Sequence, residues 1–282
     1  MMKHIPVLLN DVMAALGDIR GRTVVDCTFG AGGYSRAFLD AGANVVAFDR
    51  DPNVRADADA MRAEFGDRFT FVPRPFSALA ELPGTFDAIV FDLGISSMQI
   101  DIPDRGFSFR GDGPLDMRMS GAGTSAAELI EQLSVADLAR ILRDYGDVSR
   151  AGVIARAIKD AAPKTTFALR DLIHNPRDVA PVFQALRIAV NDEMGEVTRA
   201  LAAVPDHLHA GGMCICVTFH SLEDRLVKNT FRDWTSAPGD PRMPTVASAP
   251  FIAMRAVTPS DAELADNPRA RSAHMRGVIK SY

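Results

Sequence analysis

The sequence lacks the features of disulfide-stabilised, zinc-binding and membrane-spanning proteins. Only three of its 282 residues are cysteines, all in apolar runs, and no C-x-x-C spacing occurs. We therefore expect reduced core thiols, as in a cytosolic protein, and no metal site. No apolar run approaches the roughly 18 residues that span a bilayer, and the start lacks the apolar stretch of a secretory signal. A net charge of −5 excludes indiscriminate binding of polyanions. The sequence predicts a cytoplasmic protein without a membrane segment.

A glycine-rich turn follows the first apolar run. The turn D-C-T-F-G-A-G-G-Y-S occupies residues 26–35, and Asp49 closes the next apolar run, 19 positions after Gly30. In nucleotide-type α/β folds such a loop cradles a phosphate or carboxylate, and the later acid accepts hydrogen bonds from ribose hydroxyls. The spacing predicts a ligand that contains a ribose.

The glycine pattern of this turn separates two kinds of ligand. A dinucleotide fingerprint, G-x-G-x-x-G, needs a third glycine, but Ser35 occupies that place and Gly33 directly follows Gly32. The turn is closer to the S-adenosylmethionine loop, [DE]-x-G-x-G-x-G, from which it departs at Thr28. The alternative is a tight turn between strand and helix that binds no ligand.

Short apolar strands alternate with helical patterns in the first part of the chain. We expect strands at 24–26, 45–49, 69–72 and 86–92 and helices at 35–41 and 52–65, which indicates a parallel sheet covered on both faces. The next strong strand, 213–219, follows a predicted Gly211–Gly212 turn about 120 residues later. Because a crossover needs only about a dozen residues, the surplus predicts an inserted domain.

The insert has the patterns of a group of helices. One helix starts at Ser134, which forms a capping box with Asp137, and Gly146 stops it. Further helices are expected over 153–161, over 167–174 and from about 181 to 201. The predicted architecture is an α/β main domain, residues 1–103 and 195–282, with an inserted helical domain, residues 104–194.

The end of the fourth predicted strand is a candidate catalytic site. Asp92 closes that strand at the sheet edge where doubly wound folds bind ligands, and Leu93–Gly94 follows as flexible backbone. An acceptor here suits methyl transfer to an exocyclic amine, because the amine's lone pair is delocalised into its ring and a proton must leave. The Asp92 carboxylate or the Leu93 carbonyl could serve, and a turn or helix-cap acid is the alternative.

Two groups of residues in the insert are candidates for contact with nucleic acid. Phe107 and Phe109 lie among arginines in a loop rich in glycine and proline, so they either stack on unpaired bases or pin the loop to the core. Gln184, Arg187 and Asn191 share one face of a predicted helix, which is either solvated or holds a base or phosphate.

Polar residues near the C-terminal end form a third group. His220 follows the late strand, where Ser221 and Asp224 have the pattern of a capping box. The stretch that contains Arg269 and Arg271 has no acid from residue 267 to 282, so it is either a phosphate contact or a solvated tail.

Four stretches of the sequence match a known family. RGFSF, GPLDMRM, FQALRIAVN and FHSLEDR are long and specific, and the match covers nearly the whole chain. The chain resembles the bacterial MraW-type enzymes, S-adenosylmethionine-dependent methyltransferases that modify the 4-amino group of a cytosine in the decoding region of 16S ribosomal RNA. The resemblance implies a Rossmann-like methyltransferase sheet, S-adenosylmethionine as cofactor, and RNA recognition by the helical insert. The implied partner is 16S ribosomal RNA within the small subunit or an assembly intermediate.

The resemblance also implies roles for individual residues. The implied cofactor contacts are Gly32, Gly33, Tyr34, Asp49, Phe76, Asp92 and Gln99, with Phe76 against the adenine. As a hypothesis, the cytosine is unstacked near Asp92. Candidates near the base are Phe107, Phe109, Asp116, Arg118 and His220, and candidates for phosphate contact are Arg269 and Arg271. The chain departs from the family at Tyr34 (usually histidine), Met98 (usually proline), and Pro181 and Val182 (usually arginine and threonine).

Two other classes of protein compete with this interpretation. A nicotinamide-dependent oxidoreductase would bind a dinucleotide, and the missing third glycine of the loop counts against it. A non-catalytic RNA-binding module would not need an intact ligand site, and the presence of Asp49, Asp92 and Gln99 counts against that.

Overall fold

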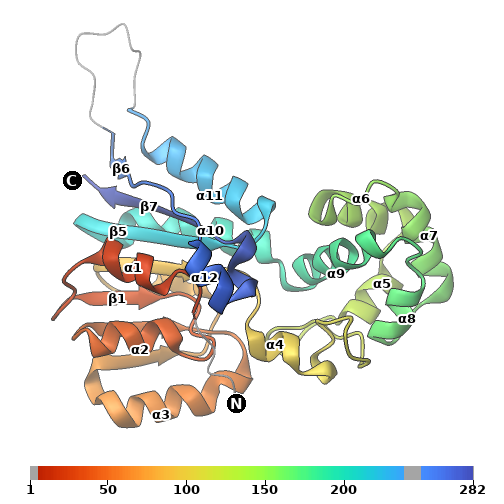
Figure 1. Ribbon diagram of the computed structural model, residues 1–282, viewed down its shortest axis with the longest axis horizontal. Coiled ribbons are helices and arrows are strands. Elements are labelled where there is room, and N and C mark those ends of the chain that lie inside the picture. Colours follow the sequence, from red (N-terminus) through yellow and green to blue (C-terminus); the bar gives the residue numbers. More distant parts are fainter. Residues whose placement is uncertain (1–5, 238–248, 282) are drawn as a thin grey trace, which may run out of the picture. The chain divides into compact units, whose positions relative to one another are not determined.

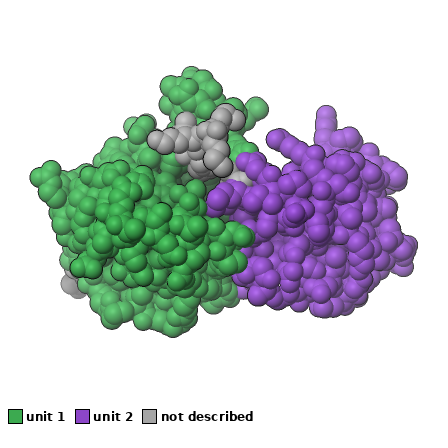
Figure 2. Space-filling view, turned by 90° about the horizontal axis from the view of Figure 1, so that it is seen from below, with its two compact units in different colours: residues 1–94, 195–282 green, residues 95–194 purple. Residues whose placement is uncertain are grey.

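The computed structural model describes residues 6–237 and 249–281, which form two compact units. Residues 1–94 and 195–282 form the sheet unit, and residues 95–194 form the helical unit (coloured separately in Figure 2). The helical unit therefore starts at Ile95, where the sequence prediction placed its start at Asp104. Within the described ranges, no helix is long and apolar enough to cross a membrane.

The sheet unit is built on one sheet, which in the described residues has seven strands in the order β3-β2-β1-β4-β5-β7-β6 (Figure 1). The strand bounds are Thr23–Asp26 (β1), Asn44–Phe48 (β2), Phe69–Val72 (β3), Phe86–Asp92 (β4), Leu208–Thr218 (β5), Phe251–Ala253 (β6) and His274–Lys280 (β7). Neighbours from β3 to β5 are parallel, as the alternation of strands and helices predicts.

The C-terminal part of the sheet corrects one expectation and excludes one of two alternatives. β7 is antiparallel to both β5 and β6, so the sheet is mixed and not parallel throughout. The end of the chain is also no solvated tail, because β7 lies between two other strands. Arg276 and Lys280 interrupt the apolar alternation of this segment, which is why its sequence resembles a basic tail.

The Gly211–Gly212 pair lies inside β5 and not in a turn before it, which is a further correction. β5 begins at Leu208, and its register with β4 shifts between Phe86 and Ala88. Gly211 has a φ of 80°, which a side chain would disfavour. The two glycines therefore allow an irregularity that the strand passes through.

Helices cover the sheet, and the described part of the sheet unit contains α1 (Leu9–Leu16), α2 (Gly33–Asp40), α3 (Arg55–Phe65), α10 (Glu193–His207), α11 (Ser221–Trp234) and α12 (Asp261–Asp266), with the first two residues of α10 in the helical unit. α10 and α11 pack on one face, where Leu201, Val204 and Phe231 join Ile89 and Phe91 of β4 in a buried cluster. Burial of each such side chain is worth about 1.5–3 kcal/mol, so this face anchors β4 firmly.

The helical unit contains α4 (Ser97–Asp101), α5 (Ala126–Gln132), α6 (Val135–Gly146), α7 (Ala151–Ala161), α8 (Thr166–Asp171) and α9 (Pro176–Asn191). The predicted Ser134 cap is present, because its side chain accepts a hydrogen bond from Asp137 N–H. α5 was not predicted. α9 starts before the expected Pro181, because Asn175 caps it and Pro176 occupies its first position. It also ends before α10, since Asp192 has a φ of 49°.

Candidate active site

The glycine turn after β1 is bonded directly to the acid at the end of β2. Gly30 N–H donates to Asp49 Oδ2 at 2.8 Å, and Asp51 N–H donates to Asp49 Oδ1 at 2.8 Å. Burial raises the pKa of Asp49, and these two hydrogen bonds oppose that rise. Because a carboxylate offers about four lone pairs, two remain for ribose hydroxyls. Asp51 caps the next turn by accepting from Asn53 N–H at 3.0 Å, as the Asp51–Pro52 pair suggests.

Replacement of Asp49 tests this assignment. We expect Asp49→Ala to weaken binding of S-adenosylmethionine about 10- to 100-fold, because hydrogen bonds to a charged acceptor contribute about 1.5–3 kcal/mol. Titration calorimetry with the purified chain measures the change. Asp57→Ala removes an exposed acid of α3 and serves as the control. Equal affinities of the two variants would contradict a ribose role for Asp49.

Pro6 and Val7, which we call the N-terminal segment, lie against the start of α2. A Cβ on Gly33 would collide with Pro6. The Tyr34 hydroxyl donates to Val7 O, and the Tyr34 ring packs against Phe38 with ring centroids 5.9 Å apart. The Tyr34 side chain thus holds the N-terminal segment, which leaves its backbone as the part available to a ligand.

Gly32 adopts a backbone conformation that favours glycine. Its φ is 76°, and a Cβ would lie 2.7 Å from Met61 Cε and 3.0 Å from Phe29 Cζ. We expect Gly32→Ala to lower the free energy of unfolding by about 1–2 kcal/mol from the left-handed conformation alone, with the contacts adding to this. Urea denaturation measures the loss. Gly21→Ala shares the positive φ, 73°, but its Cβ meets nothing within 4 Å, so it should lose less.

Asp92 is positioned by a chain of hydrogen bonds that begins in the glycine turn. Asp92 N–H donates to Thr28 Oγ1 at 2.7 Å, and Thr28 N–H donates to Asp26 Oδ1 at 3.0 Å. Ser35 Oγ in turn donates to Asp26 Oδ2 at 2.6 Å. Thr28 and Ser35 stand where the loop patterns have glycines, so these departures supply the hydroxyls that join β1 to the end of β4. Sequence reasoning noted the departures but missed this role.

Asp92 carries an unusual charge environment. Its Oδ1 is buried and has no hydrogen-bond partner among the described residues. Burial raises the pKa of Asp92 well above its usual value, and the charges of Asp26 and Glu223 raise it further. Burial also raises the pKa of Asp26 to about 6. Neighbouring acids that disfavour each other's ionisation, with one free oxygen, suit a cationic ligand.

This charge pattern distinguishes between the two candidate cofactors. S-adenosylmethionine carries a sulfonium and an ammonium, which would offset the repulsion among Asp26, Asp92 and Glu223. The pyrophosphate of a dinucleotide would add negative charge to the same place. The residues present therefore fit S-adenosylmethionine better than a nicotinamide dinucleotide.

The end of β5 adjoins the end of β4. Asp92 pairs with Val217 in the sheet, and a Cβ on Gly94 would lie 3.4 Å from the Phe219 ring. Glu223 is 1% exposed, and its Oε2 accepts from Phe219 N–H at 2.8 Å. The carboxyl ends of β1, β4 and β5 thus gather at one place, as a doubly wound sheet requires.

His220, and not the predicted Ser221, caps α11. His220 Nδ1 accepts from Glu223 N–H at 3.4 Å, and Glu223 Oε2 accepts from His220 N–H at 3.3 Å. A neutral imidazole nitrogen can accept as a hydroxyl does, so histidine fills the capping role here. His220 Nε2 lies 3.0 Å from Glu223 Oε1 without hydrogen-bond geometry. Asp224 instead pairs with Arg276, at 2.7 Å.

Phe76 forms part of an apolar wall beside β4. It follows β3, is half-buried, and meets Phe91 edge to face with ring centroids 5.7 Å apart. Its position after β3, next to the turn that Asp49 closes, suits contact with an adenine.

Comparison with known proteins identifies the family. The sequence pattern of the "MraW methylase family" matches residues 1–281. The chain belongs to the MraW methylase family. "Ribosomal RNA small subunit methyltransferase H" of Rhizobium meliloti (strain 1021) is 46% identical over 99% of this chain and 88% of its own length. The protein of the same name from Chelativorans sp. (strain BNC1) is 47% identical over 99% of this chain and 87% of its own.

Family membership confirms the predicted family, the α/β methyltransferase fold and the S-adenosylmethionine-dependent methyltransferase class. The oxidoreductase and the non-catalytic module are not supported. Among solved structures, an "rRNA Methylase from Streptococcus thermophilus" aligns with 100% of this chain and 99% of its own at a TM-score of 0.46 and 14% identity.

Arg269 and Arg271 are exposed on a short helix before β7 in the sheet unit, and the other remaining predicted site residues of this MraW-family chain lie in the helical unit. Gln99 is 6% exposed and completes a capping box with Ser96, whose N–H donates to Gln99 Oε1 at 3.1 Å. Phe107 is buried in the core of the unit, and Phe109 meets Phe183 edge to face at 5.4 Å. The structure thus favours the interpretation in which the phenylalanines pin their loop.

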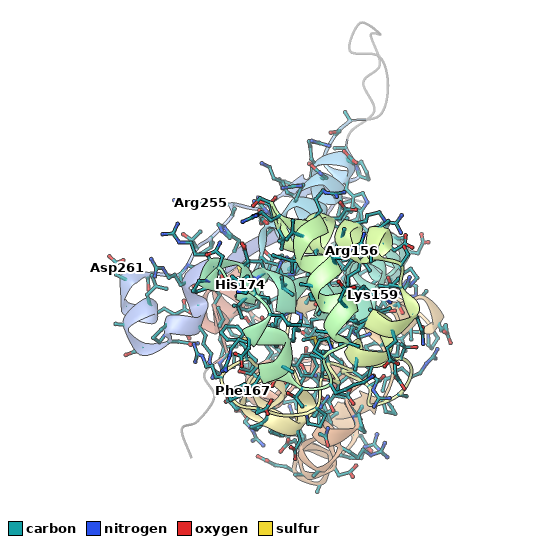
Figure 3. All side chains as sticks on the ribbon, turned by 90° about the vertical axis from the view of Figure 1, so that its right-hand side faces the viewer. Arg156, Lys159, Phe167, His174, Arg255 and Asp261 are labelled. Atoms are coloured by element: carbon teal, nitrogen blue, oxygen red, sulfur yellow. The ribbon has the colours of Figure 1, made fainter. Side chains whose placement is uncertain are left out.

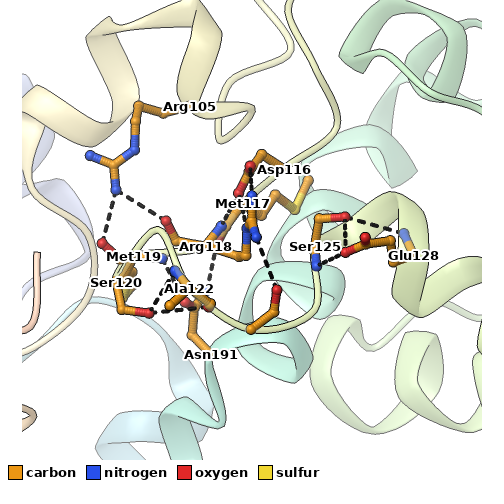
Figure 4. A network of polar contacts seen from close by, with 11 residues as sticks. Arg105, Asp116, Met117, Arg118, Met119, Ser120, Ala122, Ser125, Glu128 and Asn191 are labelled. Carbon is orange, nitrogen blue, oxygen red and sulfur yellow. Dashed lines mark hydrogen bonds and ion pairs between the residues drawn. The ribbon is translucent and has the colours of Figure 1, made fainter.

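Asp116 and Arg118 form an ion pair in the same loop (Figure 4). Arg118 Nη2 lies 2.6 Å from Asp116 Oδ2, and Arg118 Nη1 donates to Gly123 O at 2.9 Å. Burial acts to raise the pKa of Asp116, but the hydrogen bonds that Arg118 donates to Asp116, together with the charge of Arg118, lower that pKa overall. Asn191 closes the network by accepting from Met119 N–H at 2.8 Å.

The polar stripe on α9 has structural partners. Gln184 Nε2 donates to Tyr145 O at 3.0 Å, and Arg187 makes two hydrogen bonds to Glu193, at 2.8 and 2.9 Å.

The two cations of α7 that Figure 3 labels have different surroundings. Arg156 is exposed, whereas Lys159 donates a hydrogen bond to Ile130 O at 2.8 Å. Many cations of the helical unit therefore have roles within it.

Proposed function

We propose that this protein transfers a methyl group from S-adenosylmethionine to the 4-amino group of a cytosine in the decoding region of 16S ribosomal RNA. It acts in the cytoplasm on the small subunit or an assembly intermediate. The names of its relatives support the RNA substrate. The observation that carries the chemistry is the buried, unpartnered oxygen of Asp92 among other carboxylates.

The sheet unit provides most of the proposed cofactor contacts. The backbone of Gly32, Gly33 and Tyr34 faces the ligand's carboxylate, Asp49 accepts the ribose hydroxyls, and Phe76 lies against the adenine. Gln99 is a further proposed cofactor contact, on the strength of the family resemblance alone. S-adenosylmethionine supplies an electrophilic methyl group when bound.

In this proposal, Asp92 accepts a hydrogen bond from the target amine and then its departing proton. In the reaction the cytosine nitrogen would form an N–C bond to the methyl group as the donor's S–C bond breaks, and the nitrogen would lose one N–H proton. The unpartnered Asp92 oxygen can accept this N–H and draw the lone pair toward the nitrogen. The raised pKa of Asp92 lets the carboxylate hold the departing proton better than an exposed aspartate would.

Each unit contributes candidate residues for contact with RNA. Phe107, Phe109, Asp116 and Arg118 of the helical unit are proposed contacts of the RNA near the target base. His220 of the sheet unit, which follows β5, is another. Arg269 and Arg271 are exposed on a short helix before β7 and contact phosphate. The helical unit is the RNA-recognition domain. RNA binding that does not weaken as salt rises would contradict the phosphate role.

Mass spectrometry of small-subunit RNA tests the proposal directly. RNA from cells with the protein should contain a methylated 4-amino group at one cytosine of the decoding region, and RNA from cells without it should not. Restoration by the wild-type gene is the control. Calorimetry should also show binding of S-adenosylmethionine and its demethylated product. Absence of both signals would remove the proposed function.

A further inference from the structure

Cations gather along one exposed face of α11, outside the site described above. Arg225, Lys228 and Arg232 are spaced i, i+3 and i+7, so they share one side of the helix, and all three are exposed. The opposite side is buried through Val227 and Phe231. A chain whose net charge is −5 thus presents a stripe of positive charge on this helix.

Two of these cations also line a hollow beside β7. Lys228, Arg232 and Arg276 contribute to the wall of this hollow, which has a volume of about 180 Å³, together with Met254. Arg255, labelled in Figure 3, follows Met254 and is exposed. The hollow is therefore lined mainly by cations and apolar groups, which suits a phosphate attached to an organic backbone.

Nearby acids neutralise only part of this charge. Arg276 binds Asp224 through two hydrogen bonds, at 2.7 and 2.9 Å. The hydrogen bond from Arg276 lowers the pKa of Asp224, and the charge of Lys228 lowers it further. Arg232 lies 3.3 Å from Asp233 in an exposed pair, and such pairs are worth little. The charge of Arg276 already neutralises that of Asp224, so the charge of Lys228 gives the face an excess of positive charge.

The position of α11 relates this face to the reaction. Asp92 pairs with Val217 near the end of β5, and α11 begins at Ser221, directly after the His220 cap. The helix rise of 1.5 Å per residue separates the three cations by about 4.5 and 6 Å along the axis. The three charges therefore form a row along α11, which begins at the carboxyl edge of the sheet and extends away from that edge.

We propose that Arg225, Lys228 and Arg232 bind phosphates of single-stranded ribosomal RNA next to the target nucleotide. The RNA-binding role of this basic face of α11 rests on the proposed function, because that function brings a polyanion to the carboxyl edge of the sheet. It adds contacts that are separate from Arg269 and Arg271.

Salt dependence tests the basic face. Each phosphate contact of single-stranded RNA contributes about −0.7 to the slope of log affinity against log salt. We expect the triple variant Arg225→Gln, Lys228→Gln, Arg232→Gln to reduce the steepness of this slope by about 2. The slope is measured for binding of deproteinised 16S RNA and for kcat/KM on small subunits that lack the modification. The kcat with saturating RNA and the affinity for S-adenosylmethionine should stay unchanged.

A second triple variant controls for net charge. Arg20→Gln, Arg22→Gln, Arg62→Gln removes three exposed cations from the segment before β1 and from α3, and it should keep the wild-type slope. Equal slopes for both triple variants would overturn the proposal. A change on small subunits without a change for deproteinised RNA would assign the face to a ribosomal protein and also overturn it. A wild-type protein that methylates no ribosomal RNA would instead refute the proposed function.

Discussion

Replacement of Asp92 with alanine is expected to abolish methylation of ribosomal RNA. Positioned proton acceptors contribute about 10²- to 10⁴-fold to rate, and alanine removes the carboxylate, the one acceptor of the two that can take up a proton. Asp92→Asn keeps the shape and an amide oxygen but loses the charge, so it should retain more activity than Asp92→Ala. Single-turnover assays with labelled S-adenosylmethionine measure both rates. Near-normal turnover by the alanine variant would remove Asp92 from the mechanism.

Loss of activity in these variants should not come from unfolding. Asp92 Oδ1 has no partner to lose among the described residues, and burial disfavours its charge. Because the pKa of Asp92 is raised in the folded state, its ionisation opposes folding at neutral and alkaline pH, so Asp92→Asn should not lower the free energy of unfolding there. Asp87→Asn, at the other end of β4, is the matched control and should stay active.

The pH profile provides a second measurement on the same residue. Asp92 can accept the N–H only when it is ionised, so kcat/KM of the wild type should rise with pH through its raised pKa. The Asp92→Asn variant should lack this rising limb. An identical limb in both proteins would assign it to another group.

Local sequence signals predicted much of the sheet unit. β3 and β4 have the predicted bounds, because turn residues on both sides of a short apolar run define where the strand begins and ends. The spacing from Gly30 to Asp49 correctly placed two groups that are hydrogen-bonded across neighbouring strands. The local sequence around Ser134 and Asp51 was also sufficient to predict both as helix N-caps, because a cap depends on residues only two or three positions away.

The features that were missed depend on contacts between distant parts of the chain. The hydrogen bond from Asp92 N–H to Thr28 Oγ1 requires β1 and β4 to be neighbours, which no local pattern states. The place of β7 inside the sheet depends on β5, and its charged residues obscured the strand pattern. Proline at the start of α9 is favourable, whereas Pro181 lies inside that helix, and sequence reasoning chose the wrong one of the two as its start.

Replacement of Asp26 with asparagine is expected to stabilise the protein at alkaline pH. Burial raises the pKa of Asp26 from 3.8 to about 6, and this shift corresponds to a penalty of about 3 kcal/mol once the group is ionised. Asparagine can keep the hydrogen bonds with Thr28 N–H and the Ser35 hydroxyl, because its oxygen can accept from the first and its amide can donate to the second. Asp26 also has a hydrogen bond from Ser35 N–H, which asparagine can keep only through its oxygen. The variant should therefore lose the penalty and keep the geometry.

The sign of the pH dependence follows from the raised pKa. Between about pH 4 and 6 the folded state binds more protons at Asp26 than the unfolded state, so this group's contribution to stability falls as pH rises through that window. The advantage of Asp26→Asn over the wild type should be small at pH 4 and reach about 3 kcal/mol at pH 8. Urea denaturation at both values measures it, with the exposed Asp67→Asn as control.

The same variant should change the chemistry in a defined direction. The negative charge of Asp26 helps to raise the pKa of Asp92, so its removal should shift the rising limb of the pH profile to lower pH. It should also weaken binding of S-adenosylmethionine, because one of the carboxylates that favour a cation is gone. If Asp26→Asn gains stability at alkaline pH while both the limb and the affinity stay unchanged, Asp26 is a strained buried acid without influence on Asp92. A joint change in all three would show that the instability of this acid cluster is what makes it a site for a cationic methyl donor.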